Sequence, residues 1–99
     1  MLEIKKTVEN GKVTVSVEGR LDTTTAPDLE DVLKDNLIDE NEIVLDFEKL
    51  EYISSAGLRV LLATQKAMGQ TGSLKVINVN EDVMDILNVT GFSEILTIE

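Results

Sequence analysis

The chain has 99 residues, of which 42% are hydrophobic and 28% charged, with a formal net charge of −10 and neither cysteine nor histidine. These values are typical of one globular domain, and the excess of acidic side chains argues against binding to nucleic acid or to an anionic membrane. Without cysteine and histidine, disulfides, the usual zinc sites and triads with an imidazole base are excluded.

The N-terminal part of the chain predicts a β-hairpin. Apolar residues at positions 2, 4 and 8 outline a first strand, and the pair Asn10-Gly11 is typical of a two-residue hairpin turn. Valines then alternate with polar residues from Val13 to Val17. This period of two indicates a second strand with one buried face.

A helix and a buried strand follow the hairpin. Thr25 and Asp28 have the spacing of a capping box, which would start a helix at this point. Apolar residues then recur at helical intervals as far as Leu37. The compact run Ile43–Phe47 is too short for a helix, so it predicts a central strand that is buried on both faces.

Helices and strands alternate in the rest of the chain. The expected elements are a helix from Leu58 to Met68 ended by the segment 69–72, a strand from Leu74, a short helix capped by Asn80 and ended by Gly91, and a last strand over 94–98. The order β-β-α-β-α-β-α-β predicts an α/β fold with a mixed, mostly parallel sheet of about five strands and helices packed on it.

Two serines lie where the segment Glu51–Leu62, EYISSAGLRVLL, turns from an apolar run into a helix. One interpretation is a helix cap, worth about 1 kcal/mol, with Gly57 allowing the helix to pack closely on a strand. The other is a modification site, because a phosphate there would add about −1.5 to −2 charges at the positive end of the helix. We expect no catalytic residue, since the turn offers a serine no histidine or neighbouring lysine as base. We also expect no metal and no cofactor.

Three segments, in order along the chain, resemble the STAS family, the sulfate-transporter and anti-sigma-factor-antagonist domains. They are VEGRLDTTTAPDLEDVL (17–33), IVLDFEKLEYISSAGLRVLL (43–62) and GSLKVINVNEDVMDILNVTGF (72–92). The resemblance covers nearly the whole chain and is strongest to the stand-alone bacterial anti-sigma factor antagonists. It implies a STAS fold and a single STAS domain over 1–99. Family members commonly add a C-terminal helix, whereas this sequence stops at Glu99.

The resemblance implies a binding module rather than an enzyme. Such antagonists bind an anti-sigma factor that is also a serine kinase, and thereby free a sigma factor. The kinase phosphorylates the serine after the motif's aspartate, which ends binding, and a serine phosphatase restores the unmodified form. Matching Gly57-Leu58 to the family's Gly-Leu places this phosphorylation site at Ser55. Ser54 stands where the family usually has aspartate and is the alternative acceptor, and Ala56 stands where it has serine or threonine.

The same resemblance predicts which residues meet the partner. Asp22 and Asp46 either guide the kinase and its Mg²⁺-bound nucleotide or have local roles. In the local interpretation Asp22 caps or braces its loop, and Asp46 ends a strand in water. Arg59 follows Ser55 by one helical turn. It contacts either the partner or a phosphate, or it lies on a helix face that is open to solvent. The predicted partner-binding residues are Asp22, Thr23, Ser54, Ser55, Ala56, Gly57 and Arg59.

Two other functions fit the same sequence. One is a STAS subunit without a switch, in a stress assembly or a lipid-transport ATPase. The other is a nucleotide or small-anion sensor that uses the same helix N-terminus. In each case we expect a cytoplasmic location, because no apolar run reaches the roughly 20 residues that span a membrane and the N-terminus lacks a secretion signal.

Overall fold

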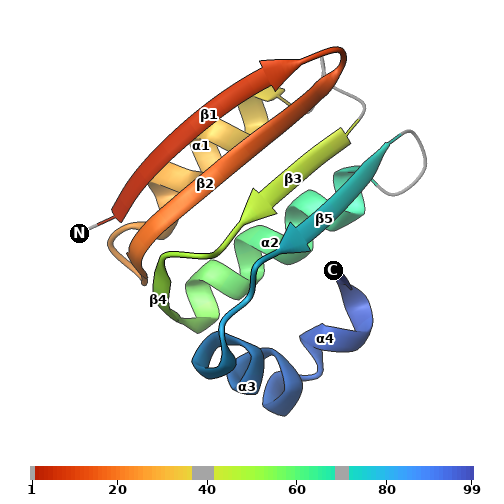
Figure 1. Ribbon diagram of the computed structural model, residues 1–99. Helices are drawn as coiled ribbons and strands as arrows, with labels where there is room; N and C mark the ends of the chain where they lie inside the picture. The colour runs from red at the N-terminus through yellow and green to blue at the C-terminus, as the bar shows by residue number, and fades with distance from the viewer. Residues whose placement is uncertain (1, 37–41, 69–71) are drawn as a thin grey trace.

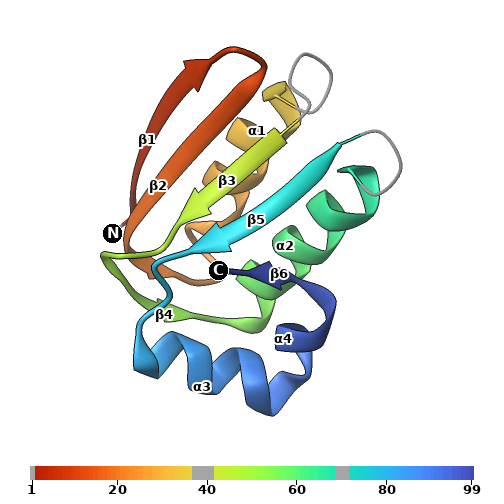
Figure 2. The same ribbon diagram turned by 45° about the vertical axis from the view of Figure 1, so that its right-hand side comes forward.

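The computed structural model describes residues 2–36, 42–68 and 72–99. Within these ranges the chain forms six strands and four helices. Figure 1 shows their arrangement, and Figure 2 also shows β6. In chain order they are β1 (Leu2–Glu9), β2 (Lys12–Leu21), α1 (Ala26–Asn36), β3 (Glu42–Asp46), β4 (Leu50–Ile53), α2 (Ser55–Met68), β5 (Ser73–Ile77), α3 (Glu81–Thr90), α4 (Phe92–Ile95) and β6 (Thr97–Ile98).

The strands form one mixed sheet in the order β1-β2-β3-β5-β6. Among the described strands, β1 and β2 form the one antiparallel pair, through a turn in which Asn10 and Gly11 have φ values of 51° and 80°. The pairs β2–β3, β3–β5 and β5–β6 are parallel. The predicted α/β fold, hairpin turn and mostly parallel sheet are therefore confirmed.

Strand β2 is long enough to have two successive neighbours on the same side. Its first half pairs with β3, and its last residues pair with β4, with Gly19 opposite Leu50 and Leu21 opposite Ile53. The chain leaves the sheet between β3 and β4, and the hydrogen bond from Gly19 N to Lys49 O, 3.1 Å long, holds the returning segment. Strand β4 leads directly into α2, so its pairing with β2 determines where the serine turn lies.

The helices α1 and α2 cover one face of the sheet and leave the other open (Figure 2). On the covered face the three valines of β2 are buried together with Leu21 at its end. Their neighbours in sequence point to the open face, because side chains alternate along a strand. Ile43, Val44 and Leu45 of β3 are all buried, as expected for a central strand.

The C-terminal part follows the prediction as far as Gly91. The Asn80 side chain accepts a hydrogen bond from Val83 N at 2.9 Å and so caps α3, which ends at Gly91 with φ 82°. The predicted strand over 94–98 is wrong in its first half, because the chain makes the short helix α4 before β6. Bonds from Glu94 N to Gly91 O and from Leu96 N to Phe92 O close that helical turn.

Two further expectations concern residues outside the described ranges, namely the helical position of Leu37 and the role of 69–71 in ending the second helix. No helix in the described part of the chain is long and apolar enough to cross a membrane.

Candidate functional site: the serine turn

The two serines at the start of α2 have different roles in the structure. Ser54 is the capping residue, since its carbonyl accepts from Leu58 N at 3.0 Å and its hydroxyl oxygen lies 3.5 Å from Gly57 N. Ser55 is the first helical residue and is exposed. Its hydroxyl makes no hydrogen bond to any residue that the structure describes. The turn therefore presents one serine outward and uses the other as a cap.

The serine turn is fixed to the end of β2. Ser54 N donates to Leu21 O at 2.8 Å, which continues the β2–β4 pairing past the last strand residue. Gly57 is buried, and a Cβ at this position would lie 2.7 Å from Leu21 Cγ and 2.9 Å from Ile53 Cγ1. The predicted close packing at Gly57 is confirmed, and the role of this glycine is to let α2 approach the sheet.

The loop after β2 is braced by the carboxylate of Asp22. Its Oδ1 accepts from Thr24 N at 3.0 Å, from Thr24 Oγ1 at 2.7 Å and from Thr25 N at 3.2 Å. Of the two interpretations for Asp22, the structure therefore shows bracing. The sequence did not single out Thr24, although an aspartate that bonds the backbone two residues ahead is a common turn element.

The expectation of a capping box at Thr25 and Asp28 is wrong. The Thr25 hydroxyl donates to Arg20 O and accepts from Asp22 N, both at 2.8 Å, so it closes the loop instead of capping α1. Asp28 N bonds the carbonyl of Thr25 at 3.0 Å, not its side chain. The helix begins at Ala26, whose N–H donates to Asp22 O at 2.8 Å.

These bonds lower the pKa of Asp22 from its usual value of 3.8, chiefly through the Thr24 hydroxyl, while partial burial acts in the opposite direction. A carboxyl with a depressed pKa stabilises the fold above its unfolded-state pKa, and this contribution is lost as the pH falls through the lower folded-state pKa. We expect Asp22→Asn to lower Tm by a few degrees at pH 7, and we expect the difference from wild type to shrink below about pH 4. Thermal unfolding followed by circular dichroism between about pH 2.5 and 7 checks this, and a pH-independent difference would contradict it.

The other predicted site residues lie on or near the turn, with one exception. Thr23, at the tip of the Asp22 loop, and Arg59, in the second turn of α2, are exposed, and Ala56 is half-buried. Asp46, by contrast, ends β3 on the open face, where its Oδ1 accepts from Glu48 N at 3.0 Å and from Asn78 Nδ2 at 3.1 Å. Asp46 ends its strand as expected, but its carboxylate bonds neighbouring residues and not only water, and the structure does not bring it to the serine turn.

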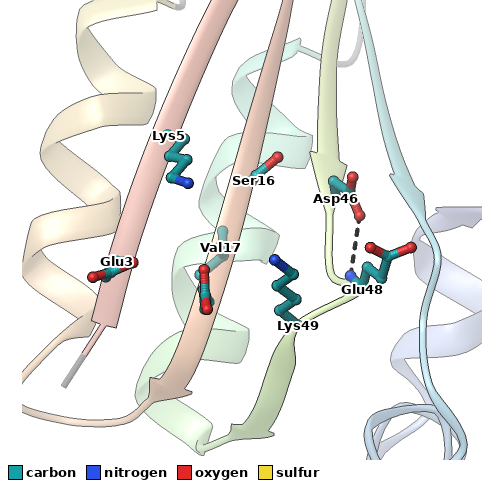
Figure 3. Close-up of a pocket in the computed structure, with 8 residues that line it drawn as sticks. Glu3, Lys5, Ser16, Val17, Asp46, Glu48 and Lys49 are labelled. Atoms are coloured by element: carbon teal, nitrogen blue, oxygen red, sulfur yellow. Dashed lines mark hydrogen bonds between the residues drawn. The ribbon is translucent and has the colours of Figure 1, made fainter.

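Asp46 borders a hollow of about 180 Å³ on the open face (Figure 3). The hollow forms where β3 ends and β4 has not yet begun. Four carboxylates and two lysines line it, which makes it a poor site for an anionic nucleotide. Its lining residues are Glu3, Lys5, Ser16, Val17, Glu18, Asp46, Glu48 and Lys49.

Comparison with known proteins identifies relatives over nearly the whole chain. The profile of the STAS domain family matches residues 3–99. The anti-sigma-B factor antagonist of Staphylococcus aureus is 30% identical over 97 residues, which are 96% of this chain and 90% of that protein. A crystal structure of an anti-sigma factor antagonist from Mycobacterium paratuberculosis has a TM-score of 0.90 at 25% identity, covering 99% of this chain and 85% of that one. The Bacillus cell fate determinant SpoIIAA in its phosphorylated form shares the fold, with a TM-score of 0.75 at 15% identity over 100% of this chain and 91% of that one.

Proposed function

The chain belongs to the STAS domain family, and we propose that it is an anti-sigma factor antagonist that phosphorylation of Ser55 switches off. In this proposal residues 1–99 act as a single STAS domain in the cytoplasm, as a binding module and not as an enzyme. The unmodified protein binds an anti-sigma factor with serine kinase activity and frees a sigma factor, and a serine phosphatase reverses the modification. The observation that carries the proposal is the exposed hydroxyl of Ser55, which has no hydrogen bond to a described residue and lies on a turn that is fixed to the sheet.

The choice of Ser55 over Ser54 rests on the geometry of the turn. A kinase must reach the acceptor hydroxyl, and Ser55 is exposed at the first position of α2. Ser54 is half-buried, and its oxygen faces Gly57 N as a cap, so transfer to it would disturb the start of the helix. We therefore assign the acceptor role to Ser55.

The switch would work through the charge of the phosphate. The unmodified turn is neutral and small, and with Thr23, Ala56 and Arg59 it offers a close-fitting contact to a partner. Phosphorylation would place about −1.5 to −2 charges inside that contact, on a chain with a net charge of −10. Burying such a charge without a counter-charge costs several kcal/mol, and each 1.4 kcal/mol is about a factor of ten in affinity. Release needs no refolding.

Phosphorylation by the anti-sigma factor kinases of the source organism tests the proposal. Each purified kinase is incubated with this chain and ATP, and the intact mass is measured. We expect one kinase to add a single phosphate to wild type and to Ser54→Ala, and none to Ser55→Ala. Stable co-purification with a partner and no mass shift would overturn the switch and support a STAS subunit without one.

A further inference from the structure

Arg20 of β2 and Tyr52 of β4 form a stacked pair on the surface beside the serine turn. The two residues are directly opposite in the β2–β4 register, and Arg20 Cζ lies 4.5 Å from the centre of the Tyr52 ring. Arg20 precedes Leu21 and Tyr52 precedes Ile53, and the side chains of Leu21 and Ile53 are buried under the helices. Because strand side chains alternate, Arg20 and Tyr52 point to the open face of the sheet.

Backbone hydrogen bonds connect the strand residues that carry this pair to the Asp22 loop and to the serine turn. The carbonyl of Arg20 accepts from the Thr25 hydroxyl at 2.8 Å, and Leu21 O accepts from Ser54 N at 2.8 Å. The pair therefore precedes the Asp22 loop on one strand and the serine turn on the other. A protein that covers the serine turn and extends over the end of the sheet would meet the pair.

Within the described part of the chain, Arg20 is a cation without a carboxylate partner. Its side chain is exposed, and no carboxylate lies within 4.0 Å of it among the residues that the structure describes, although the sequence has 19 acidic residues. Stacking on Tyr52 orders the guanidinium and leaves the N–H groups at its edge free to donate. A carboxylate is the side chain that matches this planar fork best.

We propose that the Arg20–Tyr52 pair is a specificity-determining contact that receives an aspartate or glutamate side chain of the anti-sigma factor. The inference rests on the proposed function and adds to it a contact on the face opposite α2. Arginine and tyrosine are enriched among the residues that dominate interface energies. A pre-ordered arginine also loses less side-chain entropy on binding than a free one. The pair selects partners that carry an acidic residue at this point and rejects those with a lysine or arginine.

The partner's carboxylate is a better candidate than the protein's own phosphate. Arg20 points to the open face of the sheet, because its neighbour Leu21 is buried on the other face. Ser55 begins α2, which packs on the face opposite the open one (Figure 2). Phosphorylation of Ser55 therefore does not satisfy Arg20, and the two contacts act on the partner independently.

The test is a charge reversal with a matched control on the same strand. Lys12 is an exposed cation at the other end of β2 and on the same face, so Lys12→Glu changes the net charge as Arg20→Glu does. The probe is the anti-sigma factor kinase that binds wild type and phosphorylates Ser55, with affinities measured by calorimetry. We expect Arg20→Glu to weaken binding by about 30-fold or more and Lys12→Glu by less than about 3-fold, with similar Tm values. Tyr52→Leu should weaken it by about 5-fold by releasing the guanidinium.

A restoring substitution provides the second measurement. Acidic residues of the kinase are replaced one at a time by lysine, and one such variant should bind Arg20→Glu at least about 10-fold more tightly than the unchanged kinase does. If Arg20→Glu and Lys12→Glu bind equally well while Ser55→Asp does not bind, the inference is wrong and the proposed function stands. If no kinase binds or phosphorylates wild type, the proposed function fails, and the inference fails with it.

Discussion

Replacing Ser55 by aspartate is expected to weaken binding of the anti-sigma factor by about 100-fold or more, with Tm nearly unchanged. The wild-type hydroxyl makes no hydrogen bond to a described residue that the substitution could remove, and the residue is exposed. An acidic side chain in the first turn of a helix is mildly stabilising, and α2 has no acidic residue there. The loss of affinity therefore reports a charge placed in the contact and not a damaged fold. Calorimetric titration and thermal unfolding measure the two effects separately.

Ser54→Asp is the matched control for this prediction. It adds the same charge one residue earlier, at the capping position, where aspartate is a favoured residue. We expect Ser54→Asp to keep its affinity within about 3-fold of wild type and to raise Tm slightly. Full-strength binding by Ser55→Asp would remove the physical basis of the switch.

The parts of the fold that the sequence predicts are those with a local cause. Asn10-Gly11 has the backbone freedom that a tight hairpin turn needs, Asn80 has a side chain that caps a helix, and Gly91 readily takes the positive φ that ends one. The valines of β2 show which face is buried because the period of a strand is built into the chain. The serine turn could be located for the same reason, between a strand pattern and a helix pattern.

The parts that the sequence does not predict depend on contacts between distant segments. Strand β4 has four residues, too few for a recognisable period, and exists because β2 extends beyond β3. The Thr25 hydroxyl bonds Arg20 O instead of capping a helix, which depends on how the loop folds back. The Arg20–Tyr52 pair arises from the β2–β4 register, which no local pattern fixes. The sequence therefore predicts where in the chain the candidate site lies, but not which side chains from other segments surround it.

Gly57→Ala is expected to lower the free energy of unfolding by about 2 kcal/mol and Tm by roughly 10 °C. The added Cβ would lie 2.7 Å from Leu21 Cγ and 2.9 Å from Leu21 Cδ2 and Ile53 Cγ1. Leu21 is 0% exposed and Ile53 1%, so neither side chain can move into solvent to make room. Alanine gains up to about 1 kcal/mol in helix propensity, which is smaller than the roughly 1–3 kcal/mol that overpacking costs at a site this tight. Urea unfolding followed by circular dichroism gives the difference directly.

A double-mutant cycle with Leu21→Ala identifies the cause of that loss. Leu21→Ala alone should cost about 2–5 kcal/mol, because it removes a buried side chain. In its background a methyl group added at Gly57 has space, so Gly57→Ala should be neutral or mildly stabilising, and the two changes should be strongly non-additive. An equal cost of Gly57→Ala in both backgrounds would show that the close approach of α2 to the end of β2 is not what this glycine provides. The start of α2, and with it the position of Ser55, would then need another explanation.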